Sequence, residues 1–298
     1  MNIFRRKRPQ GERIETQWSM ALRRFRKDKM AMTGVVIFLF ILLVAVVQTT
    51  VNPSGWNTLS NDYYQAPSSH HIFGTTSAGL DLFSACLKGA LQDLIVALVV
   101  SSMSMILGTI VGAIAGYFGG MLDAVLMRLV DLLLVVPLLT ILIVMSNLFQ
   151  NSSNSPLFIA LLIGFLSWTG LSRLVRAEFL ALRERPFVEA SIALGASSWR
   201  VITRHLIPNA IGTIMVNTTL TVSGAILLES TLSFLGLGIV PPAVSLGMLV
   251  QEGQGAATTS PWEFLFPAGL LLIIVLCIFA IGDGMQAAFD PRNARRKK

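Results

Sequence analysis

The amino-acid sequence predicts an all-α integral membrane protein with six transmembrane helices and both termini in the cytoplasm. Of its 298 residues, 53% are hydrophobic and only 13% are charged, whereas soluble domains carry about 25% charged residues. Six apolar runs are long enough to cross a bilayer as helices. The Lys and Arg residues cluster beside these runs, and three of the connecting segments contain neither residue, which is the pattern of a multi-pass membrane protein.

The positions of the basic residues set the predicted orientation. Of 23 Lys and Arg, ten lie in residues 1–29, six between Arg173 and Arg204, and five in residues 292–298. Because such clusters mark the cytoplasmic side, the net charge of +7 reflects membrane orientation, and no nucleic-acid partner is expected. The segments without Lys or Arg are predicted to be extracytoplasmic; they are residues 51–85, 148–156 and 231–262.

The N-terminal part contains a basic segment followed by the first span. Residues 1–29 form the cytoplasmic N-terminus, in which Trp18, Leu22 and Phe25 recur at helical spacing and predict an amphipathic helix lying on membrane lipid. The first transmembrane helix is predicted over residues 30–50. No small-residue cleavage site follows it, so we expect no cleavable signal peptide.

Residues 86–284 are predicted to form a five-helix core, whose second and third spans cover residues 91–117 and 122–146. Ser104 and three glycines recur every four residues on the second span, and close helix packing is the favoured interpretation over a ligand groove. These glycines are Gly108, Gly112 and Gly116.

The third span is predicted to kink at Pro137 and carries two charged residues, Arg128 and Asp131. Their i, i+3 spacing allows a local ion pair. Together with Asp283 in the last span, they are candidate structural or functional charges within the membrane.

The fourth span, residues 157–174, leads into a cytoplasmic loop over residues 175–206. The fifth span begins at Pro208, and Thr213, Asn217 and Thr221 share one of its faces. This polar stripe fits either the lining of a wet pathway or hydrogen bonding between helices, and both interpretations stay open.

The C-terminal part of the core contains an outer segment and the last span. Residues 231–262 are rich in Gly and Pro, and the last span covers residues 264–282. Residues 285–298 form the basic cytoplasmic tail.

The cytoplasmic loop contains a short helix of small side chains, predicted from Pro186 to Gly195. Pro suits a first helical turn, and Gly can end a helix in a left-handed cap. Between them lie Glu189, Ala190 and Ser191. A helix with so little bulk can lie in a groove of another protein.

The sequence gives no positive sign of an enzyme. It lacks a phosphate-binding loop and a His-Glu-x-x-His motif. His70 and His71 are adjacent in an outer segment, where a solvated pair is favoured over a metal site. We therefore expect no catalytic residue, no metal site and no cofactor bound by this chain.

The loop motif resembles that of ABC importer permeases. Glu189-Ala190-Ser191, then Gly195 and Pro208, is similar to the Glu-Ala-Ala…Gly…Leu-Pro motif, with Ser191 in place of the second Ala, Ile207 in place of Leu, and His205 where Ile is usual. Nearly the whole chain is similar to the dipeptide/oligopeptide (peptide/nickel) transport family, in particular to its second permease subunit. The further segments that carry this resemblance are His71-Ile72-Phe73-Gly74-Thr75, Gly79 with Asp81, Gly116-Tyr117-Phe118-Gly119-Gly120, Met127-Arg128-Leu129-Val130-Asp131 with Pro137, Leu232-Ser233-Phe234-Leu235-Gly236-Leu237-Gly238 with Pro241-Pro242, and Gly282-Asp283-Gly284 with Asp290-Pro291.

The resemblance implies a type I ABC importer permease fold in the bacterial plasma membrane. It also implies a complex with a second homologous permease, two cytoplasmic ATP-binding subunits and an extracytoplasmic solute-binding protein that delivers di- or oligopeptides. ATP and Mg would then be bound by the ATPase subunits. The residues implied to couple to an ATPase are Glu189, Ala190, Ser191, Gly195 and Pro208.

Three positions depart from the family pattern in the outer half, namely Thr76, Leu80 and Leu91, which lack the family's charged side chains. The outer segments are acidic, because they contain Asp62, Asp81 and Glu252 and no Lys or Arg. This charge weakly favours the binding of cationic groups. An importer of nickel or metal chelates is the alternative function. A stand-alone channel or secondary carrier is less favoured, because no inverted repeat is evident.

Overall fold

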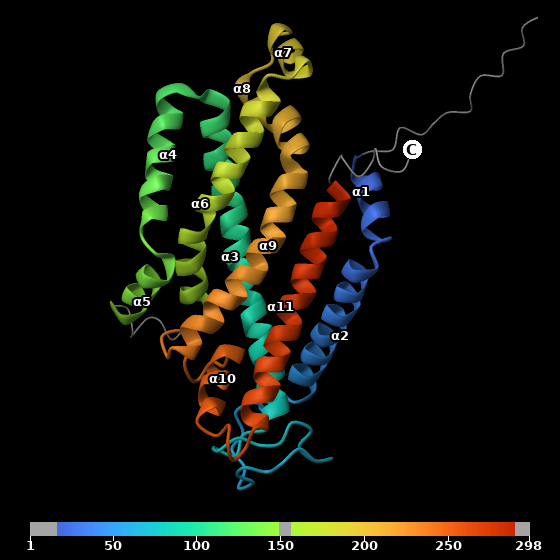
Figure 1. The fold of residues 1–298 in the computed structure, drawn as a ribbon, viewed down its shortest axis with the longest axis vertical. Helices are drawn as coiled ribbons and strands as arrows, with labels where there is room; N and C mark the ends of the chain where they lie inside the picture. The colour runs from blue at the N-terminus through green and yellow to red at the C-terminus, as the bar shows by residue number, and fades with distance from the viewer. Residues whose placement is uncertain (1–16, 149–155, 290–298) are drawn as a thin grey trace, which may run out of the picture.

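The computed structural model describes residues 17–148 and 156–289, which are helical apart from turns and loops (Figure 1). The helices are α1 (Gln17–Phe25), α2 (Lys29–Val51), α3 (Leu82–Phe118), α4 (Gly120–Val135), α5 (Leu138–Leu148), α6 (Pro156–Arg183), α7 (Pro186–Ala193), α8 (Ser198–Val201), a π-helical turn (Ile202–Leu206), α9 (Ile207–Phe234), α10 (Leu246–Gln254) and α11 (Trp262–Phe289). The predicted all-α membrane class is confirmed. The predicted segments 1–16, 149–155 and 290–298 lie outside the described residues.

Five helical segments of the described chain are long and apolar enough to cross a membrane. They correspond to α2, α3, α6, α8–α9 and α11. α4 and α5 are together long and apolar enough to form a sixth span. They do not form one straight helix, because they meet at a bend of 77°. Pro137 lies between them, so the predicted kink is confirmed, and it is far sharper than a smooth helix bend.

Two helix boundaries and one additional helix differ from what the apolar runs predict. α3 begins at Leu82, well before the apolar run, because the Asp81 side chain accepts the Ser84 N–H at 3.0 Å and caps the helix. α11 continues to Phe289. Within the predicted outer segment 231–262, the structure adds the short helix α10, which Ser245 caps.

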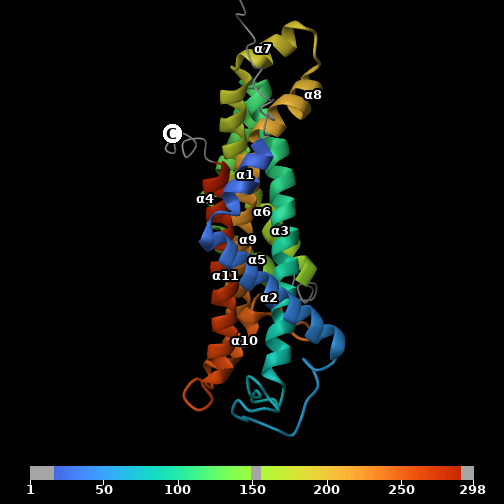
Figure 2. The same cartoon turned by 90° about the vertical axis from the view of Figure 1, so that its right-hand side faces the viewer.

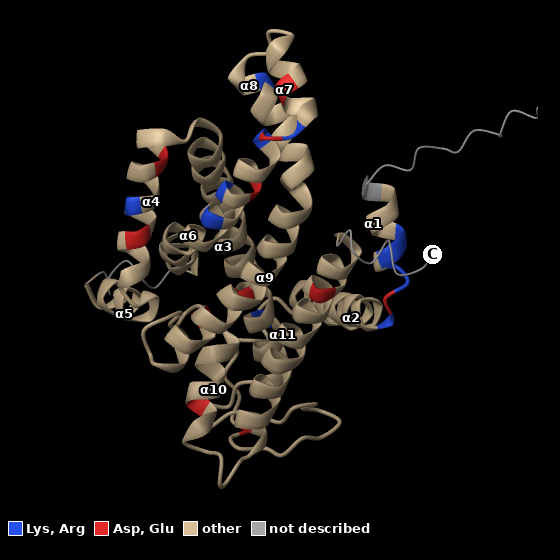
Figure 3. Cartoon of the chain, turned by 45° about the horizontal axis from the view of Figure 1, so that its top comes forward, with Lys and Arg blue, Asp and Glu red and all other residues tan. Residues whose placement is uncertain are grey.

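The two ends of the bundle differ in what they carry. α1, the last turns of α11 and the α7–α8 hairpin lie at one end, here the α7 end, whereas α10 and the loop over residues 52–81 lie at the other, the α10 end (Figures 1 and 2). Lys and Arg gather on and just after α1 and around α7 and α8, α4 carries one Arg, and none lies on α10 or on the loops beside it (Figure 3).

The predicted small-residue face of α3 packs against α6, which confirms packing over a ligand groove. Ser104 Oγ donates to the Ser167 carbonyl oxygen at 3.1 Å. A Cβ added at Gly112 would lie 2.5 Å from the Ser172 carbonyl oxygen, and one at Gly116 would lie 2.6 Å from Phe179 Cβ. Only residues without a side chain allow this approach of the two helices.

The buried apolar side chains form two clusters. The larger cluster joins α3, α6, α9, α10 and α11 toward the α10 end. The smaller cluster joins α3, α6, α7, α8 and α9 at the α7 end and contains Phe179, Val188 and Val201. This second cluster connects the short helices α7 and α8 to the spans.

Candidate functional site

The helix α7 has defined backbone signals at both of its ends. Pro186 occupies its first turn, where a missing N–H leaves no partner unsatisfied. At its C-terminus Gly195 has φ +81°, the Gly195 N–H donates to the Ile192 carbonyl at 2.9 Å, and the Ala196 N–H donates to the Ser191 carbonyl at 3.1 Å. These two bonds form a Schellman cap, so the predicted left-handed cap at Gly195 is confirmed.

The α7–α8 hairpin exposes a group of large apolar side chains, here called the docking patch. Its members are Phe187 (43% exposed), Ile192 (49%), Leu194 (89%) and Trp199 (75%). The hairpin projects beyond the other helices at the α7 end (Figure 1). Contiguous apolar side chains exposed on a projecting element are typical of a protein interaction site.

The opposite side of the hairpin is fixed to the bundle. Val188 of α7 and Val201 of α8 are completely buried and lie in one cluster with Phe179 of α6 and Leu206 before α9. A force applied to the docking patch is therefore transmitted to α6 and α9 through packed side chains rather than through a flexible loop.

The predicted coupling residues do not all lie on one surface. Glu189, Ala190 and Gly195 are exposed on or just after α7, and Ser191 is half-buried. Pro208 lies in the first turn of α9, after the π-helical turn, in which the Ile207 N–H donates to the Ile202 carbonyl.

The motif departure His205 is half-buried beside the hairpin. Its ring centroid lies 6.4 Å from that of Phe187. This residue therefore packs against the docking patch.

Two of the three residues of the polar stripe line a cavity of about 450 Å³ between α9 and α11. Thr213 and Asn217 line it together with Gln286, whereas Thr221 does not. The Asn217 side-chain amide donates to the Thr213 carbonyl at 3.0 Å, and the Thr221 hydroxyl donates to the Asn217 carbonyl at 2.9 Å. The cavity is compatible with the wet-pathway interpretation, although these hydrogen bonds lie within one helix.

The predicted local pair of Arg128 with Asp131 is wrong, because Asp131 pairs with Arg173 of α6. Arg128 is exposed and has no ion pair within the described residues. Spacing along the sequence indicates only partners on the same helix, such as the residue at i, i+3. In the folded chain, tertiary packing brings Arg173 to Asp131 instead. Asp283 is exposed on α11.

A second pair of charges joins the same two helices and was not recognised from the sequence. Asp123 of α4 pairs with Arg176 of α6, with Oδ2 accepting from Nη2 at 2.7 Å. Arg173 and Arg176 are three residues apart on α6, as suits two contacts on one helix face. The two pairs therefore hold α4 against α6.

Two further carboxyls, Asp93 of α3 and Glu229 of α9, were also not singled out. They are 1% and 0% exposed and lie close enough to interact. Asp93 Oδ2 accepts the Leu246 N–H at 3.1 Å, and Glu229 Oε1 accepts the Ser233 hydroxyl at 2.6 Å. For each of these two residues, the only sequence signal was an isolated acidic residue at the edge of an apolar run.

The outer-segment acids Asp62 and Asp81 both face His71. Its Nδ1 lies 3.1 Å from Asp81 Oδ1, and its Nε2 lies 3.7 Å from Asp62 Oδ2. In residues 17–148 and 156–289, no group of three His, Cys, Asp or Glu side chains has the geometry to hold a metal ion.

Comparisons with known proteins bear on both halves of the chain. Residues 108–295 match the family described as "binding-protein-dependent transport system inner membrane component", and residues 16–67 match the "N-terminal TM domain of oligopeptide transport permease C". The chain is similar to the oligopeptide transport system permease protein of Mycobacterium bovis, with 39% identity over 93% of this chain and 96% of that protein. It is also similar to the protein of the same name from Bacillus subtilis, with 35% identity over 92% of this chain and 90% of that protein.

Proposed function

This chain belongs to the family of binding-protein-dependent transport system inner membrane components, and from that premise we propose that it is a permease subunit of an ATP-driven peptide importer. As a member of this family it is a multi-pass protein of the bacterial plasma membrane. In the proposed complex it forms half of the pathway with a second, homologous permease. A solute-binding protein delivers di- or oligopeptides from outside, and two ATPase subunits bind ATP and Mg on the cytoplasmic side.

The observation that carries the coupling part of the proposal is the docking patch. Its apolar side chains stand on a short, capped helix whose other side is buried in the bundle. Exposed apolar area of this kind is stabilised when a partner covers it. The proposed partner is a cleft on one ATPase subunit.

The proposed orientation rests on charge. The α7 end carries the clusters of Lys and Arg, and the loops of the α10 end carry none. Since the cytoplasmic side is the basic side, α7 faces the ATPase subunits and α10 faces the solute-binding protein.

The proposed cycle follows from how α7 is held. When the ATPase subunits close on ATP, they move α7, and the cluster containing Val188 and Val201 passes this movement to α6 and α9. Because a packed cluster moves as a rigid unit, the response is a tilt of whole spans. The polar cavity at Thr213 and Asn217 lies on α9 and is the proposed part of the pathway that opens and closes.

The test is to place a charge at the most exposed position of the docking patch. Leu194→Arg puts a guanidinium where 89% of the leucine is exposed, so the fold of the permease should not change. In the complex that charge would be buried without a partner, at a cost of several kcal/mol. We expect co-purification of the ATPase subunits and peptide uptake both to fall by about tenfold or more.

The matched control is Ile72→Arg, an exposed position on the loop at the opposite end of the molecule. It adds the same side chain without touching the docking patch, so ATPase binding should remain at the wild-type level. Normal ATPase binding and normal uptake with Leu194→Arg would contradict the proposed role of α7.

A further inference from the structure

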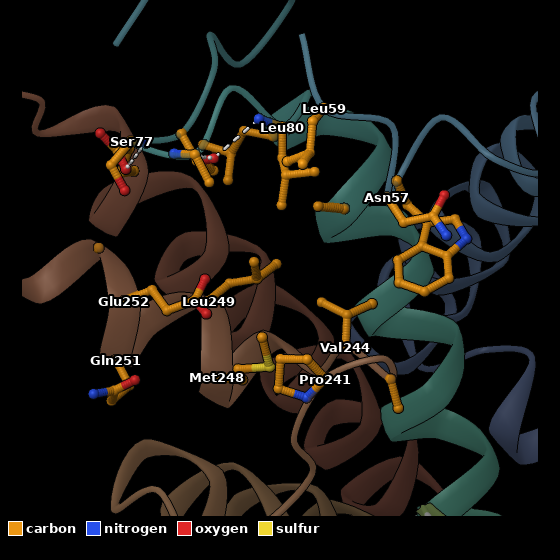
Figure 4. A pocket seen from close by; sticks show the side chains of 18 of the residues that line it. Asn57, Leu59, Ser77, Leu80, Pro241, Val244, Met248, Leu249, Gln251 and Glu252 are labelled. Carbon is orange, nitrogen blue, oxygen red and sulfur yellow. Dashed lines mark hydrogen bonds between the residues drawn. The ribbon is translucent and has the colours of Figure 1, made fainter. Parts of the chain in front are cut away.

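A cavity with a volume of about 890 Å³ lies at the α10 end. It lies between the loop over residues 52–81 and the segment that contains α10 and the start of α11. A volume of this size suits a small organic ligand. Most of its lining is apolar and includes Leu59, Leu80, Val244, Met248 and Leu249 (Figure 4).

Two carboxyls are the charged groups among the lining residues described. Glu252 comes from α10 and Glu263 from the first turn of α11. In Figure 4 the Glu252 side chain reaches from its helix toward Leu249, with Leu59 and Leu80 on the other side of the pocket. A carboxyl group therefore stands against a cavity whose lining is mostly apolar.

Glu263 is only 3% exposed and is incompletely bonded. Its Oε2 accepts the Ser77 N–H at 3.0 Å, whereas its Oε1 has no hydrogen-bond partner among the described residues. A buried carboxylate oxygen without a donor is costly. Among the described residues that line the cavity, none is Lys or Arg, so the wall supplies no positively charged donor.

The neighbouring acid Glu252 experiences this negative charge. Burial and the carboxylate of Glu263 raise the pKa of the Glu252 carboxyl. On the Trp56 side of the cavity, Lys88 Nζ lies 5.9 Å from the ring centroid of Trp56. Trp56 belongs to the lining, but Lys88 does not.

The chemistry of the lining selects the class of ligand. A divalent cation such as Ca²⁺ takes six to eight oxygen ligands, and the apolar walls do not supply them. A primary ammonium offers three donors on one compact charge, and an attached apolar group can cover the leucines and the methionine. We infer that this cavity is a binding site for a ligand that carries a primary ammonium on an apolar body.

Two sources present this chemistry at the outer surface of a membrane. One is the amino terminus of a short peptide, and the other is the ethanolamine headgroup of a phospholipid. The connection between peptide binding at this site and peptide uptake rests on the proposed transport function. The binding site itself is argued from the cavity and its two carboxyls.

The experiment uses the full chain, purified with its transport partners in nanodiscs of phosphatidylglycerol and phosphatidylcholine, neither of which has a primary amine. The probes are leucyl-phenylalanine amide and its N-acetyl derivative, titrated by calorimetry. The free amine should bind about tenfold tighter or more, as a charge-assisted hydrogen bond implies. Equal binding of the two probes overturns the inference.

The variants locate the site. Glu263→Gln and Glu252→Gln should each weaken the free amine by about tenfold and leave the acetylated probe unchanged. The control Asp62→Asn removes an exposed outer carboxyl that does not line the cavity and should bind as the wild type does. Because Glu252 keeps part of its side chain open to solvent and Gln has the same shape, Glu252→Gln remains informative if Glu263→Gln fails to fold. Wild-type affinity in both Gln variants overturns the inference.

A lipid arm separates the two sources. If phosphatidylethanolamine replaces phosphatidylcholine and weakens peptide binding in the wild type but not in Glu252→Gln, the headgroup occupies the site. Unchanged peptide binding assigns the site to the peptide.

An uptake arm separates this inference from the proposed function. Tight, amine-selective binding without ATP-driven uptake of any peptide contradicts the proposed function alone. Uptake without amine-selective binding contradicts the cavity site alone.

Discussion

The buried carboxyls Asp93 and Glu229 tie α10 to the spans. Asp93 accepts the first N–H of α10, from Leu246, while Glu229 accepts from Ser233. Both side chains are buried and next to each other. A close pair of acids in a low-dielectric interior is unfavourable unless it is hydrogen-bonded, and Asp93 Oδ1 has no hydrogen-bond partner among the described residues. The bond from Asp93 Oδ2 to α10 can be tested by isosteric replacement.

Asp93→Asn and Asp93→Ala should have different effects on stability. The amide of Asn keeps an acceptor for the Leu246 N–H and offers a donor to Glu229, so we expect a change below about 1 kcal/mol. Ala leaves the N–H and Glu229 without this partner and should cost about 2–4 kcal/mol. Thermal unfolding of the purified protein in detergent measures both. Equal effects of the two substitutions would show that the hydrogen bonds do not matter.

The binding of an ammonium ligand to the α10-end cavity should depend on pH through Glu252. Since burial and Glu263 raise the pKa of Glu252, this carboxyl stays neutral to a higher pH than an ordinary glutamate and becomes charged as the pH rises through that raised value. The charged groups near the ligand are then Glu252 and Glu263, with Lys88 beside the Trp56 wall.

The ligand ammonium stays protonated over this range, so its affinity should increase with pH, by up to about tenfold per pH unit. Calorimetric titrations of leucyl-phenylalanine amide at several pH values measure this profile. Glu252→Gln should remove the step. An affinity that decreases with rising pH in the wild type would contradict the assignment.

At the scale of elements, the stability of α7 depends on its cap. Gly195 has φ +81°, and a Cβ added there would meet no atom within 4 Å. Gly195→Ala therefore adds backbone strain of about 1–2 kcal/mol without a clash. We expect faster amide exchange at Ala196 and through the last turn of α7, together with weaker ATPase binding.

Gly170→Ala is the control for that substitution. Gly170 lies within α6, also has open space around a Cβ, and does not have a left-handed backbone. Ala in a helix interior is favoured over Gly by about 1 kcal/mol, so α7 exchange should stay unchanged. Equal exchange in both variants would mean that the cap does not hold α7.

The elements that the sequence predicted well are those with a strong local signal. Apolar runs of about 20 residues identified the spans, the spacing of Gly108, Gly112 and Gly116 predicted a close helix contact on that face of α3, and Gly195 predicted the cap of α7. The size of the bend at Pro137, the helix α10 and the Asp131–Arg173 pair were not predicted. Each depends on contacts between residues far apart in the chain, which periodicity does not report.

At the scale of the whole molecule, the helices divide the charged and uncharged loops between two ends. α1, the end of α11 and the α7–α8 hairpin lie together, and the structure places α10 with residues 52–81 at the other end (Figure 2). An even number of crossings returns the chain to the side on which it starts. The charge pattern predicted an even number, and this arrangement agrees with it. The orientation in the membrane is a proposal from the charges alone.

That orientation predicts which positions an impermeant reagent can reach. Tyr63→Cys and Leu194→Cys each place a thiol where the native side chain is exposed, by 54% and 89%, at opposite ends of the molecule. The native thiols do not interfere, because Cys86 and Cys277 are only 0% and 5% exposed. In intact spheroplasts, a charged maleimide should label position 63 within minutes and leave position 194 unlabelled until the membrane is permeabilised. The reverse pattern would place α7 outside, and the ATPase subunits could then not reach the docking patch. Labelling at both positions in intact spheroplasts would mean that the two ends do not lie on opposite sides of the membrane.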